Sequence, residues 1–359
     1  MTAQQAQIAD AIKQHKPHFP LLDGLRGVAA IAVVIFHFLE MVIWPYDKLW
    51  IGHGWLAVDF FFCLSGFVMG YAYDDRIQRM GLAEFFKGRL IRLHPMVVMG
   101  SVLGIVAFYA NPFGITPGLT PGRMALIFLM SVLVIPFGVM KERGFNNFSL
   151  NAPSWSLFWE YIANIVFGIF LNRIPRWALI VLTVVGAVWL CWAGYHAGNL
   201  YGGWNTGSFW DGGARVTFSF SAGLLIYRMK WLLRSPLGFV SLSALLMLIL
   251  VSPFKTGAWM REAAIIIFLL PLLVALGAGA KVGPRVTRLC GFLGDLSYPL
   301  YMVHYTVIWI WGDYAAKHKI TGNGLYLPVT LGVTTMIGFA TLVMQIYDKP
   351  VRRWLRLKL

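Results

Sequence analysis

Residues 22–44 have the sequence LDGLRGVAAIAVVIFHFLEMVIW, and this stretch decides the fold. It contains an uninterrupted apolar run, Val28 to Phe36. A helix that crosses a bilayer needs about 20 predominantly apolar residues, so the stretch predicts a membrane-spanning helix. It also carries Asp23, Arg26 and His37. Ionisable groups inside a membrane are costly and mark functional or paired positions.

Further segments of the same kind follow along the chain. The protein has 359 residues, of which 58% are hydrophobic and 13% are charged, whereas soluble domains have about 45–50% and about 25%. This composition excludes an ordinary soluble protein. Candidate spans lie at 22–44, 54–73, 95–110, 124–139, 155–171, 177–194, 214–229, 236–252, 262–279, 292–312 and 325–347. The sequence therefore predicts an all-α, polytopic membrane helix bundle.

The distribution of basic residues indicates how many of these eleven segments cross the membrane. Short cytoplasmic loops accumulate Lys and Arg. If 124–139 does not cross, 21 of the 30 Lys and Arg lie on the inner side, and if it crosses, the 30 divide equally. Pro136 and Gly138 also suit a broken segment that is covered by protein. We expect about ten transmembrane helices, one re-entrant or interfacial segment at 124–139, and both termini in the cytoplasm.

The same reasoning divides the chain into three parts. Residues 1–20 lack the apolar core and cleavage site of a secretory signal, so we expect them to form a cytoplasmic N-terminal segment. A membrane domain at 21–349 and a basic cytoplasmic tail at 350–359 follow. The net charge of +15 then reflects orientation in the bilayer, and no nucleic-acid partner is expected. The three cysteines lack the spacing of a metal site, and no metal is expected.

Six ionisable residues within the predicted spans are singled out as functional candidates: His37, Glu40, Asp59, Glu160, Asp295 and His304. The two histidines lie on spans that both run outward, 11 residues beyond Arg26 and 13 residues beyond Gly291. At 1.5 Å per residue, both lie roughly 16–20 Å from the inner face. This shared depth predicts one cavity for the two histidines. The alternative is a hydrogen-bonded histidine that only holds two helices together.

Three arginines near the inner face form a second group. Asp23 and Arg26 are three residues apart and share a helical face, where they are able to pair. The predicted loop between the second and third crossings carries Arg89 and Arg92 at the same spacing. Two guanidinium groups on one face suit bidentate binding of phosphates. Anchoring at the cytoplasmic face is the alternative for all three arginines.

Together these motifs resemble the acyltransferase-3 family of integral-membrane O-acyltransferases, from about Phe19 to Arg353. The resemblance rests on five motifs in the family's order: Leu22 to Gly27 with His37; Gly54 to Phe67; Arg89, Arg92, Leu93 and Pro95; Trp155-Ser156-Leu157 with Glu160; and Ser297 to Tyr301 with His304. One such motif is weak evidence, whereas five in order are strong.

The resemblance implies a function and assigns residues to it. Members of the family move an acyl group, usually acetyl, from cytoplasmic acyl-CoA through the bundle to a hydroxyl of a sugar, polysaccharide or glycolipid at the outer face. The location would be the inner (plasma) membrane. The resemblance makes His37 the catalytic histidine and Glu160 a member of the outer catalytic environment. Arg26, Arg89 and Arg92 become the ligands of the CoA phosphates.

A mechanism follows from these assignments. We expect His37 to act as general base on the acceptor hydroxyl, with Glu160 or Asp59 orienting its other ring nitrogen. A covalent acyl intermediate on Ser65 or Cys63 is the alternative, although Ser65 beside Gly66 also suits close helix packing. The remaining expected site residues are Asp23 beside the cofactor arginines, and Trp155, Ser156, Tyr298, His304 and Ser65 on the substrate side.

Two departures from the family pattern are present. Many members have aromatic residues where this chain has Ala163 and Asn164, and many continue into an esterase-like domain, whereas this sequence ends at Leu359. The rival function is a transporter or flippase for an envelope glycoconjugate, because buried His and carboxylates also form proton relays. The Arg89/Arg92 pair and the lack of a detectable inverted repeat favour the acyltransferase.

Overall fold

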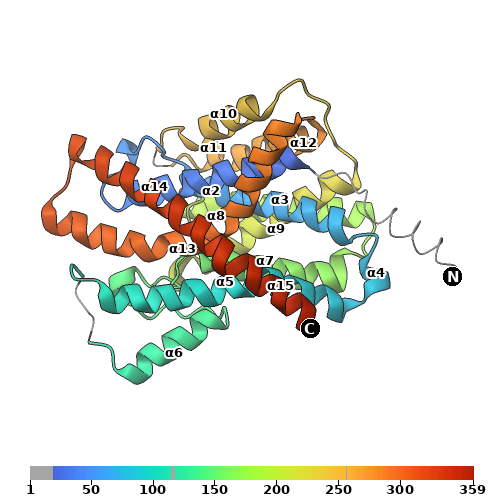
Figure 1. Cartoon of the computed structure of the whole chain (residues 1–359). Coiled ribbons are helices and arrows are strands. Elements are labelled where there is room, and N and C mark those ends of the chain that lie inside the picture. The colour runs from blue at the N-terminus through green and yellow to red at the C-terminus, as the bar shows by residue number, and fades with distance from the viewer. Residues whose placement is uncertain (1–18, 115–117, 256) are drawn as a thin grey trace.

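The structure, a computed structural model, describes residues 19–114, 118–255 and 257–359. Within these ranges the chain is a bundle of helices without strands, apart from an isolated bridge between Asn146 and Asn205. Figure 1 shows long helices packed side by side, most of them running between the same two ends of the molecule. The predicted all-α polytopic bundle is therefore confirmed. The predicted N-terminal segment, 1–20, lies almost wholly outside the described residues.

Ten helical segments correspond to the ten predicted crossings. They are α2 (Pro20–Glu40), α3 (Ala57–Tyr73), α5 (Leu82–Ala110), α7 (Ser154–Val166) with a π-helical turn (Phe167–Leu171), α8 (Arg176–Ala197), α9 (Phe209–Arg228), α10 (Phe239–Leu250), α11 (Trp259–Ala264) joined by a π-helical turn (Ile265–Leu269) to α12 (Leu270–Gly279), α13 (Pro284–His318), and α14 (Tyr326–Val343) joined by a π-helical turn (Met344–Asp348) to α15 (Lys349–Lys358).

Shorter elements complete the described chain. They are α4 (Ile77–Met80), α6 (Pro121–Val132) and five 3₁₀ turns (Tyr46–Lys48, Gly54–Leu56, Lys141–Arg143, Thr206–Ser208 and Gly322–Leu325). We call the end of the bundle where α2 begins the near end, and the end where α2 finishes the far end. Figure 1 shows α15 finishing at the near end, where the carbonyl oxygen of Leu359 accepts a hydrogen bond from Lys87 at the start of α5.

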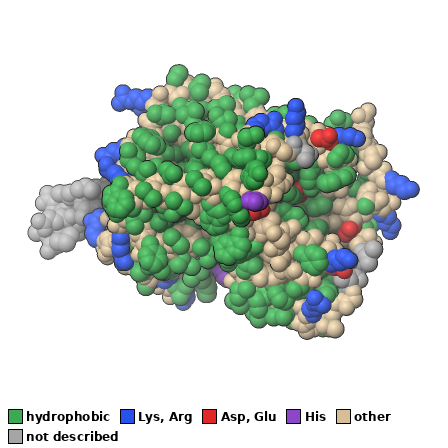
Figure 2. Space-filling view, turned by 180° about the vertical axis from the view of Figure 1, so that it is seen from behind, with side chains coloured by type: hydrophobic (Ala, Val, Ile, Leu, Met, Phe, Trp, Pro, Cys, Tyr) green, Lys and Arg blue, Asp and Glu red, His purple; other side chains and the backbone are tan. Residues whose placement is uncertain are grey.

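The helices carry a lipid-compatible surface. By length and hydropathy, seven helical segments within the described ranges are apolar enough to cross a membrane. Three further helices also match predicted crossings but fall outside this group of seven. Helix α10 is shorter, and α9 and α13 are more polar. Figure 2 shows hydrophobic side chains across the middle of one face and Lys and Arg towards both ends. The protein is a multi-pass membrane protein.

Helix α6 does not traverse the bundle. Its 12 residues span about 18 Å, but α10 is equally short, so the contacts on either side of α6 decide its course. The chain on both sides of it is tied to the far end: Asn111 donates to Asp313 on α13, and the Asn147 amide donates to the Trp204 carbonyl between α8 and α9. The segment expected at 124–139 therefore enters and leaves at one end.

One local prediction is wrong. The segment with Arg89 and Arg92 was expected in a loop, but α5 runs through it as a continuous helix from Leu82 to Ala110, with Pro95 inside. A helix-internal proline removes one backbone hydrogen bond. Near this proline, two tyrosine hydroxyls from elsewhere in the bundle donate hydrogen bonds to carbonyl oxygens of α5. Tyr298 donates to the Leu93 carbonyl, and Tyr347 donates to the Pro95 carbonyl at 3.1 Å.

Glycines close the wall between α3 and α9. A Cβ atom on Gly66 would lie 1.9 Å from the Phe220 carbonyl oxygen, and one on Gly223 would lie 1.8 Å from the Cys63 carbonyl oxygen. Neither glycine tolerates a side chain, so the two helices touch backbone to backbone. Cys63 is buried in this contact, which gives it a packing role.

Candidate active site

Two cavities lie inside the bundle and share lining residues. The near cavity includes Arg26, Ser65, Arg89, Arg92, Ser156, Glu160, Ser297 and Tyr298 in its wall. The far cavity includes His37, Glu40, Tyr46, Trp55, Glu142, Arg143, Trp155, Tyr201, Trp204, Arg215, Tyr305 and Trp309. Val58 and Tyr301 line both cavities. The two hollows therefore adjoin in the middle of the bundle.

His37 is held by a carboxylate on its own helix. Its Nδ1 atom contacts Oε1 of Glu40, three residues later on α2, and the other oxygen, Oε2, accepts a hydrogen bond of 3.0 Å from the Tyr201 hydroxyl. We assign the Nδ1 proton to the Glu40 contact, which leaves Nε2 as the basic nitrogen. Glu40 was among the ionisable residues noted in the sequence, but no role was predicted for it.

The Tyr201 phenol lies in the loop between α8 and α9. Burial, together with the Glu40 carboxylate, raises the pKa of Tyr201 well above its ordinary value. Burial and the same carboxylate raise the pKa of the neighbouring Tyr46 to about 12. Both phenols therefore stay protonated at neutral pH, and Tyr201 is a hydrogen-bond donor to Glu40.

The two histidines contact each other, although of the two only His37 lines the far cavity, for which both were predicted. The rings of His37 and His304 are stacked, with centroids 5.3 Å apart and planes 25° apart. His304 is buried, and its Nδ1 lies 2.8 Å from the Tyr301 carbonyl oxygen and 3.1 Å from that of Leu300. Those carbonyls require a proton on Nδ1. His304 therefore forms a platform beside His37, with its Nδ1 proton directed to these carbonyls.

Asp59 pairs with Arg215 and not with His37, contrary to the expectation that it orients His37. Its carboxylate and Arg215 form an ion pair in which neither side chain is exposed, with 2.7 Å between Oδ2 and Nη2. Arg215 also donates to the carbonyl oxygens of Gly202 (2.8 Å) and Trp55 (3.1 Å), and its guanidinium lies 5.1 Å from the Trp155 ring centroid. The pair ties α3 to α9 beneath the far cavity.

Glu160 likewise does not contact His37. Its Oε1 accepts hydrogen bonds from Arg89 (2.9 Å) and from Ser65 (3.1 Å) in the wall of the near cavity. Glu160, expected in the outer catalytic environment, thus lies with Arg89 and Ser65 and not beside His37, and its part in catalysis stays a prediction. Arg89, which is buried, has its charge balanced by this carboxylate.

Arg26 and Arg92 differ in how many hydrogen-bond and ion-pair partners they have in the near cavity. Arg26 forms the predicted pair with Asp23 at 2.9 Å and donates to Ser297 (2.9 Å) and to the Gly294 carbonyl (2.8 Å). Arg92 lines the same cavity, but it forms no hydrogen bond or ion pair with any residue in the described part of the chain. It is the arginine of the three with the most capacity for a ligand.

The far cavity combines aromatic faces with hydrogen-bond donors. The Nε1 atoms of Trp55 and Trp309 are buried and have no hydrogen-bond partner among the described residues. Arg143 lies over the Trp309 ring, 4.9 Å from its centroid, and burial lowers the pKa of Arg143 to about 10, so it remains charged at neutral pH. At the boundary between the cavities, the hydroxyls of Ser156 and Tyr301 lie 2.7 Å apart.

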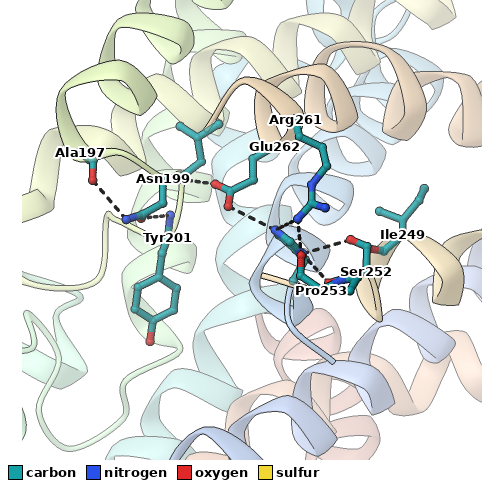
Figure 3. A network of polar contacts seen from close by, with 10 residues as sticks. Ala197, Asn199, Tyr201, Ile249, Ser252, Pro253, Arg261 and Glu262 are labelled. Atoms are coloured by element: carbon teal, nitrogen blue, oxygen red, sulfur yellow. Dashed lines mark hydrogen bonds and ion pairs between the residues drawn. The ribbon is translucent and has the colours of Figure 1, made fainter. Parts of the chain in front are cut away.

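A buried network at the far end braces the loop that carries Tyr201, and the sequence reasoning missed it. Glu262 on α11 accepts a hydrogen bond from the Leu200 amide and lies 3.3 Å from Nε2 of His53. His53 contacts the Ser252 carbonyl at 2.7 Å. Figure 3 shows Glu262 and Arg261 extending from one helix towards this cluster, with the Tyr201 ring pointing away from it.

The fold and the site define a class of protein. It is a polytopic membrane protein with an arginine-lined cavity that adjoins a second cavity holding a histidine–carboxylate pair. The chain belongs to the acyltransferase-3 family, because the family model, described as an acyltransferase domain, matches residues 19–345. The predicted family membership is confirmed.

Individual relatives agree with this assignment. Protein 2 in the picA locus of Rhizobium radiobacter is 31% identical over 181 residues, which cover 47% of this chain and 91% of that protein. Peptidoglycan O-acetyltransferase OatA of Listeria monocytogenes is 24% identical over 366 residues, which cover 94% of this chain and 56% of that protein. O-acetyltransferase OatA of Staphylococcus aureus is 37% identical over 90 residues, 24% of this chain and 14% of that protein. No solved structure matches the chain with significance.

Proposed function

We propose that this protein transfers an acetyl group from acetyl-CoA, bound at the near end, to a hydroxyl of a cell-envelope glycan at the far end. The observation that carries the proposal is the junction of the two cavities at Val58 and Tyr301. On one side of this junction, in the near cavity, lie the arginine side chains that are able to bind an anion. A histidine paired with a carboxylate lies on the other side.

The near cavity suits a coenzyme A thioester. Arg26 and Arg92 bring guanidinium groups to its wall, and such groups bind phosphate oxygens well. His37 is 11 residues further along α2 than Arg26, which is about 16 Å of helix. An extended pantetheine arm spans a gap of this size. In this arrangement the nucleotide stays near the arginines while the thioester reaches His37.

The far cavity suits a sugar. Aromatic rings offer flat apolar faces for the C–H side of a pyranose, and the unpartnered indole N–H groups of Trp55 and Trp309 offer donors for its oxygens. The Listeria monocytogenes relative is named as a peptidoglycan O-acetyltransferase, which supports a glycan of the cell wall as acceptor.

The chemistry assigned to His37 is general-base catalysis. Nε2 of His37 takes the proton of the acceptor hydroxyl as its oxygen attacks the thioester carbonyl carbon. The C–S bond then breaks, an O-acetyl ester forms, and the coenzyme leaves as a thiol after receiving the proton from His37. Glu40 stabilises the imidazolium that forms in between, in the manner of a base and its orienting carboxylate.

The orientation in the membrane is part of the proposal. The near end faces the cytoplasm, where acyl-CoA is present, and the far end faces outward. The basic tail at 350–359, which forms most of α15, then lies at the cytoplasmic face with both termini. The excess of Lys and Arg in the near-end loops supports this orientation.

Proteoliposomes test the proposal. The protein is reconstituted with [¹⁴C-acetyl]-CoA on one side of the membrane and soluble peptidoglycan fragments on the other. We expect labelled acetyl esters on the fragments only when the donor is on the near-end side, which an impermeant maleimide on an added C-terminal cysteine identifies. Movement of unmodified fragments across the membrane without ester formation would instead identify a transporter and contradict the proposal.

A further inference from the structure

The final helix carries a stripe of basic side chains. Lys349, Arg352, Arg353 and Arg356 together line a groove on the surface of α15. Their spacing of three and four residues places them on one face of the helix. Trp354, which is 58% exposed, points in roughly the opposite direction by helical periodicity. We call these four residues the basic stripe.

The basic stripe is fixed against the bundle, not free in solvent. Lys349 forms an ion pair of 2.8 Å with Asp295 on α13, and Arg352 pairs with the buried carboxylate of Asp348. At the other end of α15, the Leu359 carbonyl accepts a hydrogen bond from Lys87 on α5. The helix is therefore held beside the near ends of α13 and α5.

These contacts bring the stripe next to the mouth of the near cavity. Asp295 follows Gly294, whose carbonyl accepts a hydrogen bond from Arg26. Arg92 lies within electrostatic range of Arg26 in the cavity wall and of Arg352 on α15.

Two of the four residues of the basic stripe, Arg353 and Arg356, form no ion pair with a carboxylate among the described residues. Both side chains are exposed. Like charges in such proximity repel, and a bound anion relieves the repulsion. Two guanidinium forks one helical turn apart suit a phosphate monoester, which carries a charge of about −1.5 to −2 at neutral pH.

The chemical groups of coenzyme A follow one another in the same order as the protein side chains that would bind them. From the thioester the molecule runs through the pantetheine arm to a pyrophosphate, and then to a ribose with a 3′-phosphate. From His37 the protein runs through the near cavity to Arg26 and Arg92, and then to the basic stripe. We propose that the basic stripe binds the 3′-phosphate of the acyl-CoA donor, with Arg353 and Arg356 as its principal ligands. This inference rests on the proposed function.

The test compares two donors that differ only in that phosphate. Full-length protein in phosphatidylcholine nanodiscs is titrated with radiolabelled acetyl-CoA and with 3′-dephospho-acetyl-CoA, and the dissociation constants are measured. The wild type should bind acetyl-CoA about tenfold or more tightly than the dephospho donor. The double variant Arg353→Gln with Arg356→Gln should lose this preference and keep its affinity for the dephospho donor. Lys358→Gln, which removes a charge from α15 outside the stripe, should retain the preference.

Each contrary result has its own meaning. Equal binding of both donors by the wild type, or an equal loss for both donors in the double variant, overturns the inference and leaves the proposed function standing. Failure of the wild type to bind either donor overturns both. A lipid headgroup is the other source of phosphate, so the titrations are repeated with phosphatidylglycerol in the nanodiscs. Donor discrimination that is absent in phosphatidylcholine and appears only with the anionic lipid also overturns the inference.

Discussion

The Nδ1 atom of His37 is bonded to the carboxylate of Glu40, one helical turn further along α2. Because both residues belong to one rigid helix, the imidazole has a fixed direction towards the far cavity. The second carboxylate oxygen is bonded to Tyr201, so a loop at the far end also fixes the pair. The proposed chemistry depends on this arrangement.

Replacement of the orienting carboxylate tests the arrangement. Glu40→Gln retains the volume and removes the charge that stabilises an imidazolium. We expect the acetyl-transfer rate to fall about 10²- to 10⁴-fold, with little change in the affinity for acetyl-CoA, because Glu40 lies in the far cavity. Steady-state kinetics in proteoliposomes measure both. A rate within a factor of two of the wild type would show that His37 needs no partner.

The phenol of Tyr201 makes a smaller contribution. Tyr201→Phe removes one neutral donor to a charged acceptor, a bond worth about 1.5–3 kcal/mol. We expect the rate to fall by about tenfold. In the double variant, Tyr201→Phe should add little to the loss caused by Glu40→Gln alone, because Tyr201 acts through the Glu40 carboxylate. Fully multiplicative losses would indicate that Tyr201 acts independently of Glu40.

The Asp59–Arg215 pair predicts a loss of stability. Asp59→Asn leaves a buried guanidinium uncompensated, which costs about 3–5 kcal/mol. We expect a clearly lower melting temperature in thermal unfolding of the purified protein. Asp59→Leu combined with Arg215→Met should recover much of that loss. Asp47→Asn, at an exposed position, is the control and should melt like the wild type.

If Asp59→Asn instead melts normally but loses acetyl transfer, then Asp59 acts in catalysis. That outcome would restore the role that the sequence suggested for it. The same melting measurement therefore separates a structural ion pair from a catalytic carboxylate.

Replacement of Arg92 should weaken binding of the acetyl-CoA donor. Its guanidinium has no partner in the described chain, so Arg92→Ala should leave the fold intact and raise the KM for acetyl-CoA about tenfold or more, while kcat is retained. Arg285→Ala, which removes an exposed charge from the start of α13, should have no effect. An unchanged KM in Arg92→Ala would mean that the near cavity does not hold the phosphates of the donor.

The all-α helix bundle could be predicted from the sequence because it depends on local quantities, whereas the orientation of its two ends in the membrane stays a prediction. Apolar length locates the spans, and the number of basic residues in the loops distinguishes ten crossings from eleven. The similar depth of His37 and His304 could also be predicted, since helical rise gives the depth of each residue. Their ring contact could not, because it depends on the packing of α2 against α13. The Asp23–Arg26 pair follows from spacing within one helix.

The partners of the carboxylates could not be predicted in this way. Arg215 lies one residue inside a predicted span and was counted with the outer loop residues, although a charge inside a span signals a buried pair. Its pairing with Asp59 depends on contact between α3 and α9, which are far apart in sequence. The pairing of Glu160 with Arg89 depends likewise on the contact between α5 and α7. The network of His53 and Glu262 joins α11 to two loops that are distant in sequence, and it has no periodic signal.

The most direct test of the account is single-turnover acetyl transfer by His37→Gln. Glutamine approximates the size of the imidazole but cannot accept the hydroxyl proton. The variant is loaded with [¹⁴C-acetyl]-CoA in proteoliposomes and mixed with peptidoglycan fragments. We expect wild-type affinity for the donor and a transfer rate at least about 10²-fold lower. Transfer at the wild-type rate by this variant would contradict the proposed role of His37.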